Sequence, residues 1–163
     1  MSTSIRNITQ DLKSLKINTS KSKPIKHWLI RIGDGINFNN SLSNSLWGFN
    51  NNNNCSKSFI KNATTNDILW FVTANSKGHI IGFATYQSLN TKDDEPIFNN
   101  NQTNGWNQYK DYSNNWNIII HFINYRSIST DNVLSHIKGN APIRLYKQNL
   151  CINLNDIYNM YNQ

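Results

Sequence analysis

The chain has 163 residues, which suits one compact domain with a single core. Its net charge of +7 and its 12% of aromatic residues favour a polyanionic partner such as nucleic acid. Asparagine occurs 31 times, and because it favours turns and opposes helix interiors, a helical bundle is not expected.

Metal and membrane chemistry have no support in the sequence. The two cysteines, Cys55 and Cys151, and the four histidines lack the spacing of a zinc site, and no cofactor is expected. No secretory signal or membrane span is visible. We therefore expect an intracellular protein, cytoplasmic or nuclear, with free thiols and a monomeric state.

The first half of the chain predicts an extension followed by a strand and short helices. Residues 1–24 form an N-terminal extension with weak helical spacing, closed by Pro24, and residues 25–163 form the domain. The apolar run "KHWLIRI" (26–32) predicts a buried strand. A helical turn is expected in "NNSLSNSL", a loop at 50–54 and a short helix within 57–67.

Residues 67–88 carry the clearest signal, a β-hairpin. The runs ILWFV and HIIGFATY flank the turn ANSKG. Gly82 inside the second run indicates a bulge or a close backbone approach. Both Trp28 and Trp70 lie within strand runs and are expected in the core, as is Trp116.

The second half alternates irregular and regular segments. Residues 89–115 are a long polar loop that nevertheless holds three aromatic residues, which disordered loops generally lack. A strand at 116–128, a short helix at 129–139 and a strand at 141–149 follow. A C-terminal helix begins with Asn153 or Asn155 as its N-cap. The order predicts an α+β (mixed) fold, a partly closed β-barrel of about five to six strands surrounded by short helices.

The segment "NSLWGFNNNNNC" (44–55) places a tryptophan at the edge of an asparagine run. We expect Trp47 to lie at the mouth of a loop, where an aromatic side chain often contacts a ligand. The alternative is a tryptophan that packs the loop onto the barrel.

The pattern "HWLIRI", "SLW", "LWFVTANSKGHIIGFATY", Trp106 and "WNIIIHFI" resembles the YTH domain and its relative the EVE domain, both of the PUA-like fold. The resemblance covers roughly residues 26–160. The "ND" at 66–67 resembles the EVE domain's "GD", and "GDGINF" with "WG" resembles small EVE-like proteins of large DNA viruses, which would place the protein in host cytoplasm.

The resemblance implies an aromatic cage for a modified base. Trp47 matches the first cage tryptophan and Trp106 the second, while either Tyr109 or Tyr112 falls near the third position. Aromatic planes stack on a base and exclude water from its methyl group.

The resemblance also implies contacts to the base edge and to phosphate. Asn37 matches a residue that contacts the base edge, and the backbone carbonyl of Gly48 is expected to accept the remaining N6 proton. Gly33 stands where the family has a polar or aromatic side chain, so that contact is missing here, and Asp34 is the candidate to replace it. Arg31 matches a phosphate-binding residue; the further phosphate candidates, chosen for charge, are Lys77, Arg126, Lys138, Arg144 and Lys147.

The sequence therefore predicts a modified-base reader of single-stranded RNA or DNA, with RNA and N6-methyladenine as first choices, and not an enzyme. One alternative is a protein–protein interaction module that uses the same aromatic loops. The other is a nucleotide or nucleic-acid hydrolase drawing on Asp34, Asp67, His79 and Cys55, although no spacing links these residues.

Overall fold

The computed structural model describes residues 23–33, 35–73, 78–91, 117–128, 141–147 and 153–162. The predicted extension (1–24, apart from its last two residues) and the helix expected at 129–139 lie outside this part of the chain, as does Trp116. The elements are β1 (His27–Arg31), α2 (Ile36–Leu42), β2 (Leu46–Phe49), α3 (Asn54–Asn62), β3 (Ile68–Val72), β4 (Ile80–Thr91), β5 (Ile118–Ser127), β6 (Ile143–Leu145) and α5 (Leu154–Tyr161).

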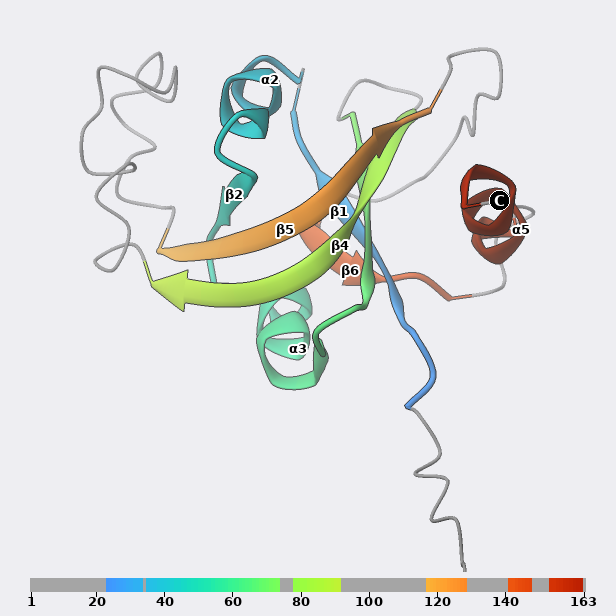
Figure 1. Cartoon of the computed structure of the whole chain (residues 1–163). Coiled ribbons are helices and arrows are strands. Elements are labelled where there is room, and N and C mark those ends of the chain that lie inside the picture. Colours follow the sequence, from blue (N-terminus) through green and yellow to red (C-terminus); the bar gives the residue numbers. More distant parts are fainter. Residues whose placement is uncertain are drawn as a thin grey trace, which may run out of the picture.

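The six strands form one sheet in the order β2-β5-β4-β3-β1-β6, which curls into a half-barrel (Figure 1). β1 and β3 pair in parallel, and the other neighbours are antiparallel. The predicted α+β class and partly closed barrel are confirmed. β2 and β6 are the two edge strands.

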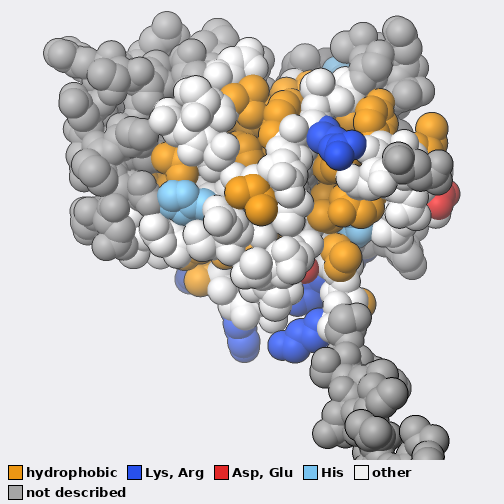
Figure 2. Space-filling view, viewed as in Figure 1, with side chains coloured by type: hydrophobic (Ala, Val, Ile, Leu, Met, Phe, Trp, Pro, Cys, Tyr) orange, Lys and Arg blue, Asp and Glu red, His pale blue; other side chains and the backbone are white. Residues whose placement is uncertain are grey.

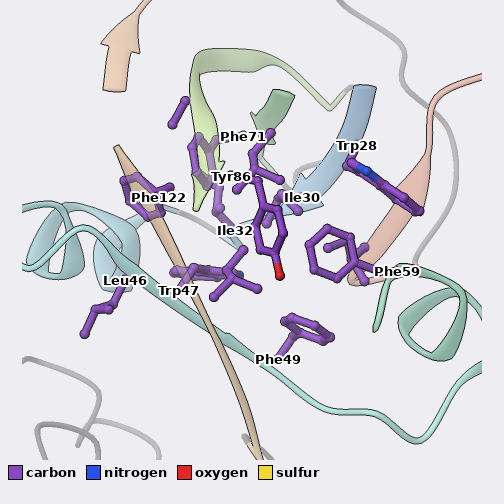
Figure 3. Close-up of a cluster of buried hydrophobic side chains, with 14 of the residues drawn as sticks. Trp28, Ile30, Ile32, Leu46, Trp47, Phe49, Phe59, Phe71, Tyr86 and Phe122 are labelled. Carbon is purple, nitrogen blue, oxygen red and sulfur yellow. The ribbon is translucent and has the colours of Figure 1, made fainter. Parts of the chain in front are cut away.

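Successive side chains of a strand point to opposite faces of the sheet, and in β1 and β3 the side chains on both faces are buried. Trp28, Ile30 and Phe71 point into one cluster, which is drawn in Figure 3. Leu29 and Trp70 point into a second cluster, which α5 covers with Leu154 and three partly buried side chains. Burial on both faces explains why β1 and β3 read as continuous apolar runs. The prediction that Trp28 and Trp70 lie in the core is confirmed, since both are fully buried.

Asparagine caps two of the helices. The Asn53 side chain accepts from Ser56 N at 2.8 Å and starts α3 inside the asparagine run, earlier than the sequence predicts. Phe59 then anchors α3 in the core. Asn153 accepts from Asn155 N at 3.1 Å, so Asn153 is the N-cap of α5.

The predicted hairpin is confirmed as β3 and β4, and β4 continues into the segment expected to be loop. At Gly82 the backbone and Tyr125 approach closely: a Cβ there would lie 2.5 Å from Tyr125 Oη and 2.6 Å from Arg126 O. Tyr125 reaches this position because β5 carries an extra residue opposite β4, with Asn124 at φ 56°. The bulge turns Tyr125 toward the cluster of Phe38 and Phe71.

Asp67 is a buried carboxylate that joins three segments. Its Oδ1 accepts from Lys26 N at 3.0 Å and Thr64 Oγ1 at 3.1 Å. Its Oδ2 accepts from Trp28 Nε1 at 2.9 Å and Thr64 N at 3.0 Å. Four hydrogen bonds thus offset the free-energy cost of removing this carboxylate, which is 1% exposed, from water. The same residue accepts from Tyr86 N through its backbone carbonyl, so β1, β3 and β4 are fixed at one point.

His27 fixes α5 against the other face. Its Nδ1 accepts from Trp70 Nε1 at 2.9 Å, so the neutral ring carries its proton on Nε2. The ring stacks on Trp70 and meets Tyr158 of α5 edge-on. Burial lowers the pKa of His27 below its ordinary 6.5, against the opposing effects of the Asn155 side chain and the Asp67 charge.

Asp67→Asn should lower the free energy of unfolding by about 3 kcal/mol, because an amide NH2 would have to face donors that the carboxylate now satisfies. Urea denaturation measures the effect. Asp156→Asn is the matched control: this carboxylate lies exposed in the first turn of α5, so its loss should cost under about 1 kcal/mol. Equal losses in the two variants would contradict the structural role of Asp67.

His27 should make stability fall on acidification. Because its folded pKa is lowered, the unfolded chain binds more protons from pH 6.5 down to the folded pKa. The free energy of unfolding should therefore fall in that window, by at most about 1.4 kcal/mol per pH unit. In His27→Asn the amide oxygen keeps an acceptor for Trp70 and does not titrate. Denaturation between pH 7 and 5 should give a flatter profile for His27→Asn, and identical profiles would contradict the assignment.

Candidate functional site

The described part of the chain is strongly basic. It contains eight Lys and Arg residues but only two acidic ones, Asp67 and Asp156. Asp67 is buried and hydrogen-bonded, so it contributes little to the surface. Figure 2 shows Lys and Arg side chains gathered beside α3, whereas apolar and uncharged side chains dominate the face of β4 and β5.

A cleft of about 570 Å³ lies between α3 and the edge strand β6. We name it the α3–β6 cleft. Arg144 and Lys147 supply its positive charge and Tyr146 its aromatic ring. The other lining residues are Leu29, Asn54, Cys55, Ser58 and Leu145, so none of the lining residues is acidic.

The cleft also has backbone groups at the edge of β6. Tyr146 N donates to His27 O and Arg31 N donates to Pro142 O, at 2.8 Å each. Bonded positions alternate along an antiparallel ladder, so the polar backbone groups of Leu145 point away from β1. An exposed edge of this kind offers a donor and an acceptor to a bound molecule.

The structure brings Arg31 and Arg144 together, two of the predicted phosphate contacts. Arg144 pairs with Leu29, so it lies on the same face of the sheet as Arg31. Arg31 is held by a 2.7 Å bond from its Nη1 to Thr73 O. Burial, and secondarily the charge of Arg144, lowers the pKa of Arg31. Two neighbouring guanidinium groups favour an anion between or beside them.

Arg126 lies elsewhere. It is on β5, and β4, β3 and β1 separate it from β6, which corresponds to about 19 Å along the sheet at the usual strand spacing. Its Nη1 donates to the carbonyl of Tyr161 at the end of α5. Lys77 and Lys138 lie outside the described residues. The predicted phosphate contacts therefore do not form one continuous surface within the described part of the chain.

Trp47 does not lie at the mouth of a loop, and that expectation is wrong. It belongs to β2, pairs with Ile120 and is 3% exposed. Its ring meets Phe38 at a centroid distance of 5.8 Å and lies with Ile32 and Tyr86 in the core cluster (Figure 3). The sequence did not reveal β2, because four residues between polar runs give little periodicity. Trp106, Tyr109 and Tyr112 lie outside the described residues, so the cage stays a prediction.

Of the two predicted base-edge contacts that are described, Asn37 carries a buried polar atom without a partner and Gly48 turns its backbone away from the neighbouring strand. Oδ1 of Asn37, in α2, is buried and accepts no hydrogen bond in the described structure. Phe122 N donates to Ser45 O, so the alternating ladder turns the backbone groups of Gly48 away from β5, toward the open edge of β2. Asp34 lies outside the described residues.

Some lining residues of the α3–β6 cleft were not predicted. Asn54, Cys55 and Ser58 come from the first turns of α3, and Tyr146 follows β6. The N-cap signal of Asn53 locates the helix in the sequence, but nothing there indicates that α3 packs beside β6.

The comparisons with known proteins establish the fold. The chain is similar to the crystal structure of a mutant ZmASCH protein from Zymomonas mobilis, with TM-score 0.55 and 9% identity over 83% of this chain and 96% of that one. It is also similar to a hypothetical protein from Leishmania major, with TM-score 0.50 and 11% identity over 86% of this chain and 98% of that one. The fold is PUA-like.

Other comparisons give no further identification. No family model matches the chain, and no curated protein matches it. The likeness to these structures is one of fold, and the YTH or EVE assignment and the viral origin have no support from them. Among the described residues, no helix is long and apolar enough to cross a membrane, and no group of three metal-ligating side chains occurs.

Proposed function

We propose that this PUA-like domain binds single-stranded nucleic acid, RNA first, with the phosphate backbone held in the α3–β6 cleft. The observation that carries the proposal is the composition of that cleft: Arg144, Lys147 and Tyr146 line it, and none of its lining residues is acidic. A polyanion binds most favourably where the cationic side chains have no carboxylates beside them. Tyr146 adds a ring on which a base can stack.

The proposed role is binding without turnover, by a monomer. A hydrolase would need a free acid or base beside its nucleophile. Asp67, one candidate for that role, is 1% exposed and both of its oxygens are occupied. Cys55 lines the cleft, but neither a histidine nor an acidic residue lines it beside the thiol.

The double variant Arg144→Ala/Lys147→Ala should weaken binding of a single-stranded RNA oligonucleotide by about tenfold or more, because two phosphate contacts are lost. Fluorescence anisotropy at several salt concentrations measures this. The slope of log K against log salt should become shallower by about 1.4, at about 0.7 per phosphate on a single strand.

Arg126→Ala is the matched control for this experiment, because it removes the same guanidinium group from a position about 19 Å away along the sheet. It should leave oligonucleotide affinity within about twofold, the range of a distant surface charge. Equal losses in Arg126→Ala and in the double variant would contradict the assignment to the cleft. Unchanged affinity in the double variant would remove the proposal itself.

The finer proposal is that a modified base, N6-methyladenine first, is read near Asn37 and Gly48. Its support is the buried, unpartnered Oδ1 of Asn37 and the Gly48 backbone groups that face the open edge of β2. An acceptor already removed from water discriminates strongly between bases that can and cannot donate to it. Trp47 packs in the core nearby, so Trp47→Ala would leave a cavity and destabilise the domain by about 3 to 5 kcal/mol.

For this reason base reading is tested with Asn37→Ala and not with Trp47→Ala. Wild-type protein should bind an oligonucleotide with one N6-methyladenine more tightly than its unmodified twin, and Asn37→Ala should reduce that preference about tenfold. Asn39→Ala, an exposed asparagine on the same helix, is the control and should keep the preference. Titration calorimetry gives both affinities. Equal wild-type affinity for the two oligonucleotides would end the modified-base proposal while leaving strand binding intact.

A further inference from the structure

A second cavity lies on the sheet face that α5 covers. It measures about 310 Å³ and is bounded by β4, β5 and the C-terminal half of α5. Tyr158 brings a half-buried aromatic ring, and the buried Phe83 supports it from the core with a ring centroid 5.5 Å away. Thr85, Asn124 and Asn162 bring hydroxyl and amide groups, and Arg126 brings a charge.

The bulge in β5 shapes this cavity. Asn124 has φ 56°, a left-handed conformation that costs a side-chain-bearing residue about 1 kcal/mol or more. The extra residue places Asn124 among the lining residues, and Tyr125, which also lines the cavity, turns its ring toward Phe38 in the core. Strained residues of this kind occur often at binding sites, where the position of a side chain matters more than its cost.

Arg126 is held in place by α5. One of its nitrogens donates to the Tyr161 carbonyl at the end of α5. A guanidinium group has five N–H donors in a planar fork, so the remaining donors can still meet an anion. None of the residues that line the cavity is acidic, so nothing in the lining competes for that charge.

We propose that this cavity binds one free nucleoside monophosphate, with the base against Tyr158, an edge contact from Asn124, and the phosphate on Arg126. A volume of about 310 Å³ is at the lower limit of small-molecule sites, which suits a single nucleotide and not an oligonucleotide. One cation in the lining suits a monophosphate better than a triphosphate. The site goes beyond strand binding in the α3–β6 cleft and does not depend on it.

Titration calorimetry with AMP, adenosine and inorganic phosphate as separate probes tests the proposal. Wild-type protein should bind AMP at least about tenfold more tightly than either part alone, because base and phosphate contacts combine. Arg126→Ala should weaken AMP binding about tenfold. Asn124→Gly should weaken it about fivefold, and because glycine tolerates a positive φ, this variant removes the amide without adding strain.

The control is Lys61→Ala, which removes an exposed cation in the last turn of α3 that lines neither cavity and should leave AMP binding unchanged. A thermal melt of each variant shows that α5 stays in place, and Asn124→Gly remains informative if Arg126→Ala loses stability. Inorganic phosphate binding as tightly as AMP would overturn the nucleotide assignment, and so would undiminished AMP affinity in Asn124→Gly. Loss of AMP binding with intact oligonucleotide binding in Arg126→Ala would support this site and leave the strand-binding proposal untouched.

Discussion

The fold depends on one buried carboxylate. Asp67 accepts four hydrogen bonds from the segment before β1, from Trp28 and from the turn before β3. A charge in this position is tolerated only when its oxygens are fully paired, so the donors must all be in place together. That requirement sets the start of β1 against the start of β3 and hence the parallel register between them. The hairpin strand β4 joins the same point through the bond from Tyr86 N to Asp67 O.

In the described part of the chain the sheet ends in two edge strands, and the candidate contacts lie along them. β6 carries the α3–β6 cleft, and β2 carries the outward-facing backbone of Gly48. In a closed barrel the backbone groups of the two end strands would hydrogen-bond to each other, whereas in a half-barrel they can bind a partner. The curvature that buries the aromatic cluster and the polar edges that can bind a ligand are therefore two results of the same incomplete closure.

Local patterns in the sequence predicted much of the fold and less of the site. The runs on either side of ANSKG predicted the hairpin, and apolar continuity placed Trp28 and Trp70 in the core. Trp47 was misplaced, because a four-residue edge strand inside an asparagine-rich region carries no readable period. The approach of Arg31 to Arg144 joins residues 113 positions apart, and only the sheet order shows it. The bulge at Asn124 was also invisible, since asparagine is common at every turn of this chain.

The contact between Gly82 and Tyr125 has a consequence for related sequences. The glycine has no space for a methyl group while the phenol ring and the Arg126 carbonyl occupy it. Descendants of this domain should thus inherit the two positions as a pair: a larger residue at 82 is compatible only with a smaller one at 125 and a shifted β5 backbone. Correlated variation at these sites would record, in an alignment, the presence or absence of the extra residue in β5.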